Sequence, residues 1–213
     1  MRPGYEHNVR IILGELALDG ILGIPPNPKG IVIFAHGSGS GRLSPRNNFV
    51  ARHLQQNGLA TLLLDLLTPD EAEDRRNVFD IDLLADRVLL TKAWLEQEPR
   101  TKKLGVGYFG ASTGAGAALQ AAAREPSNIQ AVVSRGGRPD LAERYLPSVT
   151  APTLLIVGGW DEPVIDMNRS AFELLICEKQ LVIVPGATHL FEEPGTLEQV
   201  ANHACAWFLQ HHY

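Results

Sequence analysis

Short runs of apolar residues recur along the chain and alternate with longer segments in which apolar residues return every three or four positions. The run Gly-Ile-Val-Ile-Phe-Ala at 30–35 has no polar position, which is typical of a strand buried on both faces. Strands are predicted at 9–13, 16–24, 31–35, 59–64, 104–109, 129–134, 153–157 and 181–184. Helices are predicted at 47–57, 78–98, 113–124, within 166–175 and at 198–210.

Glycines mark the ends of several of these elements. Gly58 stands where the C-terminal cap of the first predicted helix belongs. Gly14 and the dipeptide Asp19-Gly20 interrupt the first apolar segments and indicate a hairpin. Strands that alternate with helices favour a mostly parallel sheet with helices on both faces. The sequence therefore predicts an α/β fold in one domain over residues 1–213, since no repeat or linker interrupts the pattern.

Composition narrows the class of protein. The chain has 213 residues, of which 45% are hydrophobic and 20% charged, so it can bury a core. The formal net charge of −5 argues against a nucleic-acid groove or an anionic membrane surface as the main partner. No run of about 18 apolar residues predicts a transmembrane helix, and the N-terminus shows no secretory signal. We therefore expect a soluble cytoplasmic protein.

The two cysteines, Cys177 and Cys205, cannot form a disulfide framework, and no metal-type spacing of Cys and His surrounds them. We expect both to be buried thiols in a reducing compartment. A single bridge between them is the alternative that the sequence leaves open.

The pentapeptide Gly110-Ala111-Ser112-Thr113-Gly114 follows directly on the predicted strand 104–109 and leads into the predicted helix 113–124. A G-x-S-x-G sequence at such a turn exposes the serine hydroxyl above the sheet edge, and the glycines give the space that a sharp turn needs. The new helix also directs free N–H groups toward the serine. Ser112 is therefore the predicted nucleophile. The alternative is a turn of small residues that only packs strand against helix.

A serine hydroxyl needs a base, and the chain has seven histidines. His189 follows the predicted strand 181–184 through a short loop, so it should share the carboxyl edge of the sheet with Ser112. His36 fits a structural hydrogen-bonding role beneath a loop. The remaining five precede the first strand, fall inside predicted helices or lie at a frayed C-terminus: His7, His53, His203, His211 and His212. His189 is therefore the predicted base.

An acid must orient the base and stabilise the imidazolium that forms. Asp161 lies in a loop after a predicted strand, at the same sheet edge. Glu162 and Asp166 are competitors, although Asp166 is explained as an acid at the start of the next helix. Asp65, after an earlier strand, is the more distant alternative. With Asp161 as the acid, the chain order of nucleophile, acid and base is that of the α/β-hydrolase scaffold.

An oxyanion hole completes the expected site. One donor is the N–H of Thr113, the residue after the nucleophile, and the second should come from the loop after an earlier central strand. That loop, His36-Gly-Ser-Gly-Ser-Gly41, lets backbone approach a substrate closely. We nominate the Ser38 N–H, and Gly37 or Gly39 fits equally well. A phosphate-binding loop is the alternative, but neither dinucleotide nor P-loop spacing is present in this loop.

Four segments together resemble the α/β-hydrolase superfamily, and its dienelactone-hydrolase-like branch most closely. They are Ile31-Val-Ile-Phe-Ala-His-Gly37, the turn at 110–114, Gly159-Trp160-Asp161 and Gly186-Ala187-Thr188-His189. The resemblance covers roughly residues 8–209 and implies an eight-stranded, mostly parallel sheet with a triad of Ser112, Asp161 and His189. Dienelactone hydrolases proper use a cysteine nucleophile, whereas position 112 is serine. The fold and esterase-like chemistry therefore carry over, and the dienelactone substrate does not.

The connection from 134 to 153 is short and contains three prolines, so a lid domain does not fit between these two strands. Without a lid we expect a shallow, open site that favours small or solvent-accessible acyl groups. The acidic stretch 70–74 is most simply a solvated loop face.

A few residues near the expected site could select a substrate. Arg135 and Arg138 follow a strand end beside the triad and could bind a substrate carboxylate. Pairing with nearby acids to hold the loop is the alternative, and we favour it. Trp160 could form a wall of the acyl pocket, although packing against the core is the more frequent role. Arg42 and Arg46 raise the same question as the first two arginines.

These residues predict a serine hydrolase, most simply a carboxylesterase that cleaves small or accessible esters through an acyl-enzyme. The mechanism needs no metal or organic cofactor, and the expected partner is a small-molecule ester or related acyl substrate. Thioesterase, peptidase, acyltransferase or lyase chemistry with the same triad is one alternative. A catalytically silent binding protein on the same fold is another. The sequence leaves the oligomeric state open.

Overall fold

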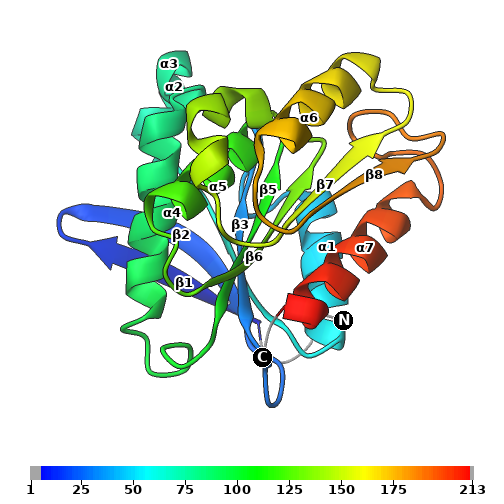
Figure 1. Ribbon diagram of the computed structural model, residues 1–213. Coiled ribbons are helices and arrows are strands. Elements are labelled where there is room, and N and C mark those ends of the chain that lie inside the picture. Colours follow the sequence, from blue (N-terminus) through cyan, green and yellow to red (C-terminus); the bar gives the residue numbers. More distant parts are fainter. Residues whose placement is uncertain (1–5, 212–213) are drawn as a thin grey trace.

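The computed structural model describes residues 6–211, which contain one continuous sheet of eight strands (Figure 1). The strand order is β1-β2-β4-β3-β5-β6-β7-β8. Strand β2 pairs antiparallel with both β1 and β4, and the other neighbours are parallel. The strand bounds are Glu6–Leu13 (β1), Leu16–Gly23 (β2), Ile31–Ala35 (β3), Ala60–Leu64 (β4), Val106–Ala111 (β5), Ile129–Arg135 (β6), Thr153–Gly158 (β7) and Lys179–Val184 (β8). The predicted eight-stranded, mostly parallel sheet is confirmed.

Helices cover both faces of the sheet, with α1 and α7 on one face and α4, α5 and α6 on the other (Figure 1). Because side chains of a strand point alternately to the two faces, Phe34 and Phe109 join one apolar core while Ile33 and Tyr108 join the other. The helix bounds are Pro45–Gln56 (α1), Pro69–Glu73 (α2), Arg75–Val78 (α3), Ile81–Leu95 (α4), Thr113–Arg124 (α5), Glu162–Leu174 (α6) and Thr196–His211 (α7), with a 3-10 segment η1 at Pro139–Ser148.

The first helix begins and ends at the signals that its sequence contains. The side chain of Ser44 caps α1 by accepting a hydrogen bond from the N–H of Asn47, and Pro45 occupies the first turn. Beyond the helix, Gly58 has a φ of +86° and donates its N–H to the carbonyl of Gln55. This left-handed position is the predicted glycine stop.

The hairpin between β1 and β2 turns at Gly14, which has a φ of +66°. The dipeptide Asp19-Gly20 does not form the turn, contrary to the expectation, because both residues pair within β2. An added Cβ at Gly20 would lie 3.1 Å from the carbonyl oxygen of Leu63. This glycine therefore allows close packing of neighbouring strands rather than a change of direction.

Residues 70–73 of the acidic stretch are helical rather than a loop, although Asp70 and Glu73 are exposed to solvent as predicted. Thr68 and Glu71 form a reciprocal capping box at the start of α2, which outweighs the repulsion between neighbouring acids. Glu71 also pairs with Arg87 of α4 at 2.5 Å, so the segment is attached to the long helix behind it. Helix α4 itself begins at Ile81, after the N-cap Asp80, later than the predicted start.

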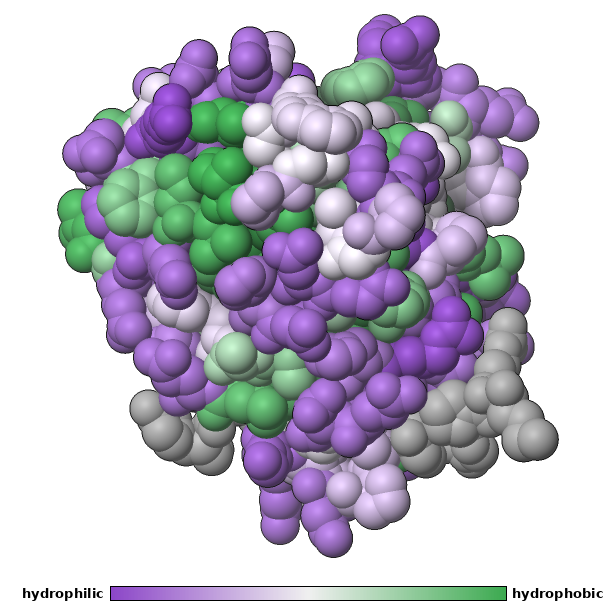
Figure 2. Space-filling model, turned by 90° about the vertical axis from the view of Figure 1, so that its right-hand side faces the viewer, coloured by the Kyte–Doolittle hydropathy of each residue, from purple (hydrophilic) through white to green (hydrophobic). Residues whose placement is uncertain are grey.

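The connection between β6 and β7 holds only the kinked segment η1, which packs on α5 and α6. At the far edge of the sheet, β8 pairs with no further strand within residues 6–211. Figure 2 shows the face that carries this edge, where an apolar area lies among broad polar ones. Ile176, just before β8, and Ile183 within it are exposed. None of the helices in residues 6–211 is long and apolar enough to cross a membrane.

Candidate active site

The predicted nucleophile sits in a strained turn between β5 and α5. Ser112 has a φ of +52° and a ψ of −122°, a conformation that costs a non-glycine residue about 1–3 kcal/mol. The flanking glycines are required by close packing: an added Cβ at Gly114 would collide with the carbonyl oxygens of Ala35 and His36. At Gly110 it would meet the backbone of Ala115. The sharp turn predicted from G-x-S-x-G is confirmed.

Backbone hydrogen bonds fix this turn to the segment after β6. The N–H of Ser112 donates to the carbonyl of Arg135 at 3.2 Å. Its own carbonyl accepts from the N–H of Arg138 at 3.0 Å and from that of Ala115 at 3.1 Å. Because these three backbone hydrogen bonds fix the strained conformation of Ser112, the serine keeps it without a ligand.

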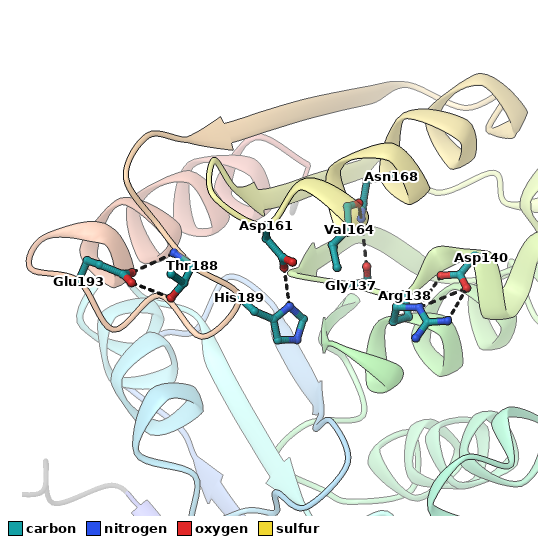
Figure 3. Close-up of polar contacts among 9 residues, drawn as sticks. All are labelled: Gly137, Arg138, Asp140, Asp161, Val164, Asn168, Thr188, His189 and Glu193. Carbon is teal, nitrogen blue, oxygen red and sulfur yellow. Dashed lines mark hydrogen bonds and ion pairs between the residues drawn. The ribbon is translucent and has the colours of Figure 1, made fainter.

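Asp161 and His189 form the hydrogen-bonded pair that the sequence predicted (Figure 3). Nδ1 of His189 lies 2.6 Å from Oδ2 of Asp161, whose side chain is 14% exposed. Asp161 occupies the N-cap of α6 but makes no side-chain capping bond, so its carboxylate serves the imidazole instead. A carboxylate only accepts, so Nδ1 carries the proton and Nε2 is left as the basic nitrogen.

The competing acids lie elsewhere. Helix α6 starts at Glu162, so Asp166 lies inside the helix rather than at its start, where the sequence placed it. Its carboxylate pairs with Arg169 at 3.4 Å and is largely exposed. Asp65 accepts from both the backbone N–H and the guanidinium of Arg42. Among the described residues, Asp161 is the acid bonded to His189.

A second carboxylate, which sequence reasoning missed, holds the His189 loop. Glu193 accepts from the N–H of Thr188 at 3.0 Å and from its hydroxyl at 2.6 Å (Figure 3). These hydrogen bonds lower the pKa of Glu193 below its usual range. The available signal was an acid four positions after the predicted base, at a spacing that a tight loop can close.

Ser112 and His189 both contact the segment around Gly136. The N–H of Ser112 bonds to the residue before this glycine, and an added Cβ on Gly136 would lie 3.6 Å from Cε1 of His189. The described contacts contain no hydrogen bond from the serine hydroxyl to the imidazole. Such catalytic bonds are often long in ligand-free enzymes and tighten when substrate binds.

The glycine-rich loop lies against the turn as predicted. An added Cβ on Gly37 would be 2.9 Å from Cβ of Ser112. Ser38 and Thr113 are the two predicted oxyanion donors. The N–H of Ser38 donates a hydrogen bond to Oγ1 of Thr113 at 3.1 Å. The loop and the first residue of α5 therefore form one unit, in which the Ser38 N–H already has an acceptor.

His36 has the structural role expected from its position. Its Nε2 accepts from the N–H of Leu66 at 3.0 Å, so Nδ1 carries the proton and donates to the carbonyl of Gly37 at 2.9 Å. Burial lowers the pKa of this imidazole. His211 departs from the expected frayed terminus: it is buried in α7 and its Nδ1 lies 2.8 Å from the carbonyl of Trp207.

A cavity of about 520 Å³ opens beside the glycine-rich loop. The β1–β2 hairpin and the α2–α3 segment form its walls. Its apolar lining comes from Ala17, Leu18, Leu67, Ala72, Val78 and Leu84. Ser38 and Thr113 lie at its border, so the cavity reaches the predicted oxyanion hole. Its volume is typical of a small-molecule site.

The residues proposed to select a substrate have different surroundings. Arg138 makes a bidentate pair with Asp140 at 2.9 and 2.8 Å, which is the loop-holding alternative (Figure 3). Trp160 is 67% exposed and lines none of the three cavities described in the molecule.

Arg135 is buried and contacts no acid within the described residues. Asn168, which the sequence did not reveal, donates to the carbonyl of Gly137 at 3.0 Å and supports the same loop.

Both cysteines are free. Cys205 is buried in α7, whereas Cys177 is only partly buried, close to the hydroxyl of Thr153. The single bridge that the sequence left open therefore does not form. Burial raises the pKa of each thiol, which keeps both protonated at neutral pH.

Comparison with known proteins agrees with this fold. The sequence profile of the dienelactone hydrolase family matches residues 18–211. A crystal structure of dienelactone hydrolase from Anabaena variabilis is 58% identical, has a TM-score of 0.95 and covers 98% of both chains. A serine hydrolase without lid from Xanthomonas campestris has the same fold at 20% identity, with a TM-score of 0.77 over 98% of this chain and 95% of that one.

Curated relatives are longer. Two proteins from Mycobacterium tuberculosis strains, both named putative phosphoribosyl transferase, are 58% identical over 209 residues. The match covers 98% of this chain and 47% of each relative, so the chain spans about half the length of the curated relatives that it matches. The profile match, the near-identical fold of a 58% identical structure and the Ser112 turn lead to one conclusion: this chain belongs to the dienelactone hydrolase family of α/β hydrolases.

Proposed function

We propose that the protein is a serine carboxylesterase that cleaves small or accessible esters through an acyl-enzyme. The observation that carries this proposal is the 2.6 Å pair of Asp161 and His189 beside a serine held at a φ of +52°. Nucleophile, base and acid stand in the chain order of α/β hydrolases. A serine at the turn supports ester chemistry with an oxygen nucleophile rather than the cysteine chemistry of dienelactone hydrolases proper.

Acylation begins when Oγ of Ser112 attacks the ester carbonyl while Nε2 of His189 takes its proton. The Asp161 carboxylate holds the imidazole in the Nδ1–H tautomer and stabilises the imidazolium. The carbonyl oxygen becomes an oxyanion, to which the Thr113 N–H and the glycine-rich loop donate. The imidazolium then gives its proton to the leaving alcohol as the ester bond breaks.

Deacylation repeats these steps with water. Nε2 of His189 removes a proton from a water molecule as its oxygen attacks the acyl carbonyl. The tetrahedral intermediate collapses, the bond to Oγ of Ser112 breaks, and the imidazolium returns the proton to the serine. The carboxylic acid leaves and the enzyme returns to its starting state. Every step uses the chain's own side chains and water, so we propose no cofactor.

The cavity of about 520 Å³ supports an acyl group of limited size. It borders the two residues expected to bind the oxyanion, and the acyl carbon must lie between these and Ser112. Its wall of aliphatic side chains suits an alkyl or small aryl group. Arg42, held by Asp65 and Asp19, lies on the same wall, so its charge is already neutralised.

Phosphoribosyl transfer is not our proposal, although the curated relatives carry that name. The name belongs to proteins of which only 47% is matched here. The glycine-rich loop lacks the spacing of a dinucleotide or P-loop phosphate site and instead packs on the Ser112 turn. Thioesterase, peptidase and acyltransferase activity would use the same three residues and differ only in acyl donor or acceptor.

The test is a panel of p-nitrophenyl esters, acyl thioesters and amides, assayed with the wild type and Ser112→Ala. We expect ester hydrolysis to dominate in the wild type and to fall by several powers of ten in the variant. Ser38→Ala, which keeps the backbone N–H, is the matched control and should retain activity. A fluorophosphonate probe should label the wild type only. Hydrolysis that survives in Ser112→Ala, or folded wild type that resists the probe, would refute the proposal.

A further inference from the structure

The guanidinium group of Arg135 is buried and, among the described residues, lacks hydrogen-bond partners for part of its donors. The residue is 7% exposed, and its Nε and Nη1 atoms have no hydrogen-bond partner within residues 6–211. A buried charge without a partner costs several kcal/mol in stability, so buried guanidinium groups are normally paired. Two other arginines near the site are only partly buried and are paired, Arg42 with Asp65 and Arg138 with Asp140.

A second guanidinium reinforces this charge instead of neutralising it. Arg46, in the first turn of α1, also has a buried Nε without a partner. Burial and the nearby Arg46 charge lower the pKa of Arg135 to about 10, so Arg135 stays cationic at neutral pH. Arg46 has one carboxylate partner, Glu192, whose oxygen lies 3.2 Å from Nη1 and whose side chain is 63% exposed.

We propose that Arg135 and Arg46 form a binding site for an oxyanion, a carboxylate or a phosphate group. Guanidinium groups present planar arrays of N–H donors that match such oxygens in pairs. The buried Nε and Nη1 atoms of Arg135 and the Nε of Arg46 supply three free donor atoms. A bound anion would provide the missing acceptors and the opposite charge, which removes the cost of burying this pair.

This site adjoins the catalytic residues. The carbonyl of Arg135 accepts the N–H of Ser112, and the next residue, Gly136, packs against His189. Glu192 lies three positions after His189 and attaches the same loop to Arg46. An anion bound to the two arginines would compete with Glu192 for Arg46. Binding of the anion would therefore affect the loop that carries His189. The anion is either part of the ester substrate or a free ion.

The first experiment measures binding without relying on hydrolysis. The midpoint of thermal unfolding is followed as sodium phosphate or sodium acetate is added at constant ionic strength, with sodium chloride as the reference salt. We expect a saturable rise of several degrees in the wild type and none in Arg135→Met. Arg138→Gln, the matched control with a paired guanidinium, should respond as the wild type does. Glu192→Gln removes the competing carboxylate and should bind several-fold more tightly.

Arg46→Gln is the second variant and should weaken anion binding at least tenfold, which keeps the test decisive if Arg135→Met fails to fold. Equal responses of the wild type, Arg135→Met and Arg46→Gln would overturn the proposal. So would a wild type that responds to phosphate and acetate no more than to chloride. These outcomes are independent of any catalytic activity.

The second experiment, which rests on the proposed esterase activity, identifies the source of the anion. Hydrolysis of neutral p-nitrophenyl acetate is compared with that of the anionic mono-p-nitrophenyl ester of glutaric acid. If the anion belongs to the substrate, Arg135→Met raises KM for the anionic ester at least tenfold more than KM for the neutral one. If it is a free ion, phosphate changes the rate with the neutral ester in the wild type and not in Arg135→Met. If neither phosphate nor Arg135→Met changes the rate of hydrolysis of either ester, the anion site is not linked to catalysis.

Discussion

The N–H of Ser38 donates a hydrogen bond to the hydroxyl oxygen of Thr113 at 3.1 Å, across 75 positions of sequence. This bond connects the loop after β3 with the first residue of α5, directly beside Ser112. A hydroxyl that accepts one hydrogen bond still has its own proton to donate. Thr113 therefore brings both its backbone N–H and its hydroxyl to the border of the cavity, where the oxyanion is expected.

Replacing Thr113 with valine keeps the shape of the side chain and removes the acceptor for the Ser38 N–H. A neutral hydrogen bond contributes about 1 kcal/mol, which corresponds to about fivefold in rate when it is lost from the oxyanion hole. We expect kcat for p-nitrophenyl acetate to fall about fivefold in Thr113→Val, with little change in KM. Thr113→Ser keeps the hydroxyl and should stay close to the wild type. Equal kcat values for the two variants would rule out a role for the hydroxyl.

Asp161→Asn tests the pair with His189. The amide can donate to Nδ1 and so favours the tautomer whose Nε2 carries a proton, which cannot act as a base. We expect kcat to fall by about 10⁴, as it does for the corresponding change in other Ser-His-Asp sites. The control is Asp166→Asn, which neutralises a neighbouring, exposed acid and should leave kcat unchanged. Full activity of Asp161→Asn would show that another acid serves the base.

Much of this arrangement could be predicted because local signals and global topology agree. The helix predicted at 113–124 matches α5, since glycine, strand and helix signals meet at Ser112. Asp161 and His189 were found because each follows a strand, and in a parallel sheet the strand ends share one edge. Topology alone therefore brings together residues that lie far apart in sequence.

Pairing between side chains was harder to predict. Arg135 and Arg138 are only three positions apart, yet Arg138 is paired with Asp140 and Arg135 is buried without an acid. Residue spacing does not determine this difference, because Arg135 is buried at the end of β6, whereas Arg138 lies outside the sheet at the start of η1. Of the two hairpin signals, Gly14 forms the turn and Asp19-Gly20 does not: the dipeptide has the local preference of a turn, but strand pairing overrides it.

Gly114→Ala tests the tight contact behind the nucleophile. The added methyl group would collide with the backbone oxygens of Ala35 and His36, which belong to the central strand and cannot move away easily. We expect a loss of about 3 kcal/mol or more in the free energy of unfolding, measured with urea. Gly39→Ala is the control: its φ is +67° but nothing lies within 4 Å of the new Cβ, so it should cost about 1–2 kcal/mol. A more stable Gly114→Ala than Gly39→Ala would contradict this account.

His36 predicts a defined pH dependence of stability. Burial lowers its pKa below the ordinary value of 6.5, against weaker opposing effects of Gly37 and Asp65. Below that pH the unfolded chain takes up a proton that the folded one does not. The contribution to stability is therefore complete above pH 6.5 and is lost as the pH falls toward the folded pKa. The free energy of unfolding should decrease less steeply with acid in His36→Gln, whose side-chain oxygen can still accept from Leu66.

Ala17→Phe tests whether the cavity receives the acyl group. Ala17 lies in β2 and lines the cavity, and phenylalanine is favoured in strands, so the substitution should fill space without breaking the sheet. A pocket that loses room for a few methylene groups discriminates by about 10-fold or more between long and short chains. We therefore expect kcat/KM for p-nitrophenyl hexanoate to fall at least about tenfold relative to the acetate ester. Ala17→Ser, which adds little volume, should leave the ratio unchanged. If Ala17→Phe lowers both rates equally, the acyl chain binds on another side of Ser112, and the cavity beside the glycine-rich loop takes the leaving alcohol instead.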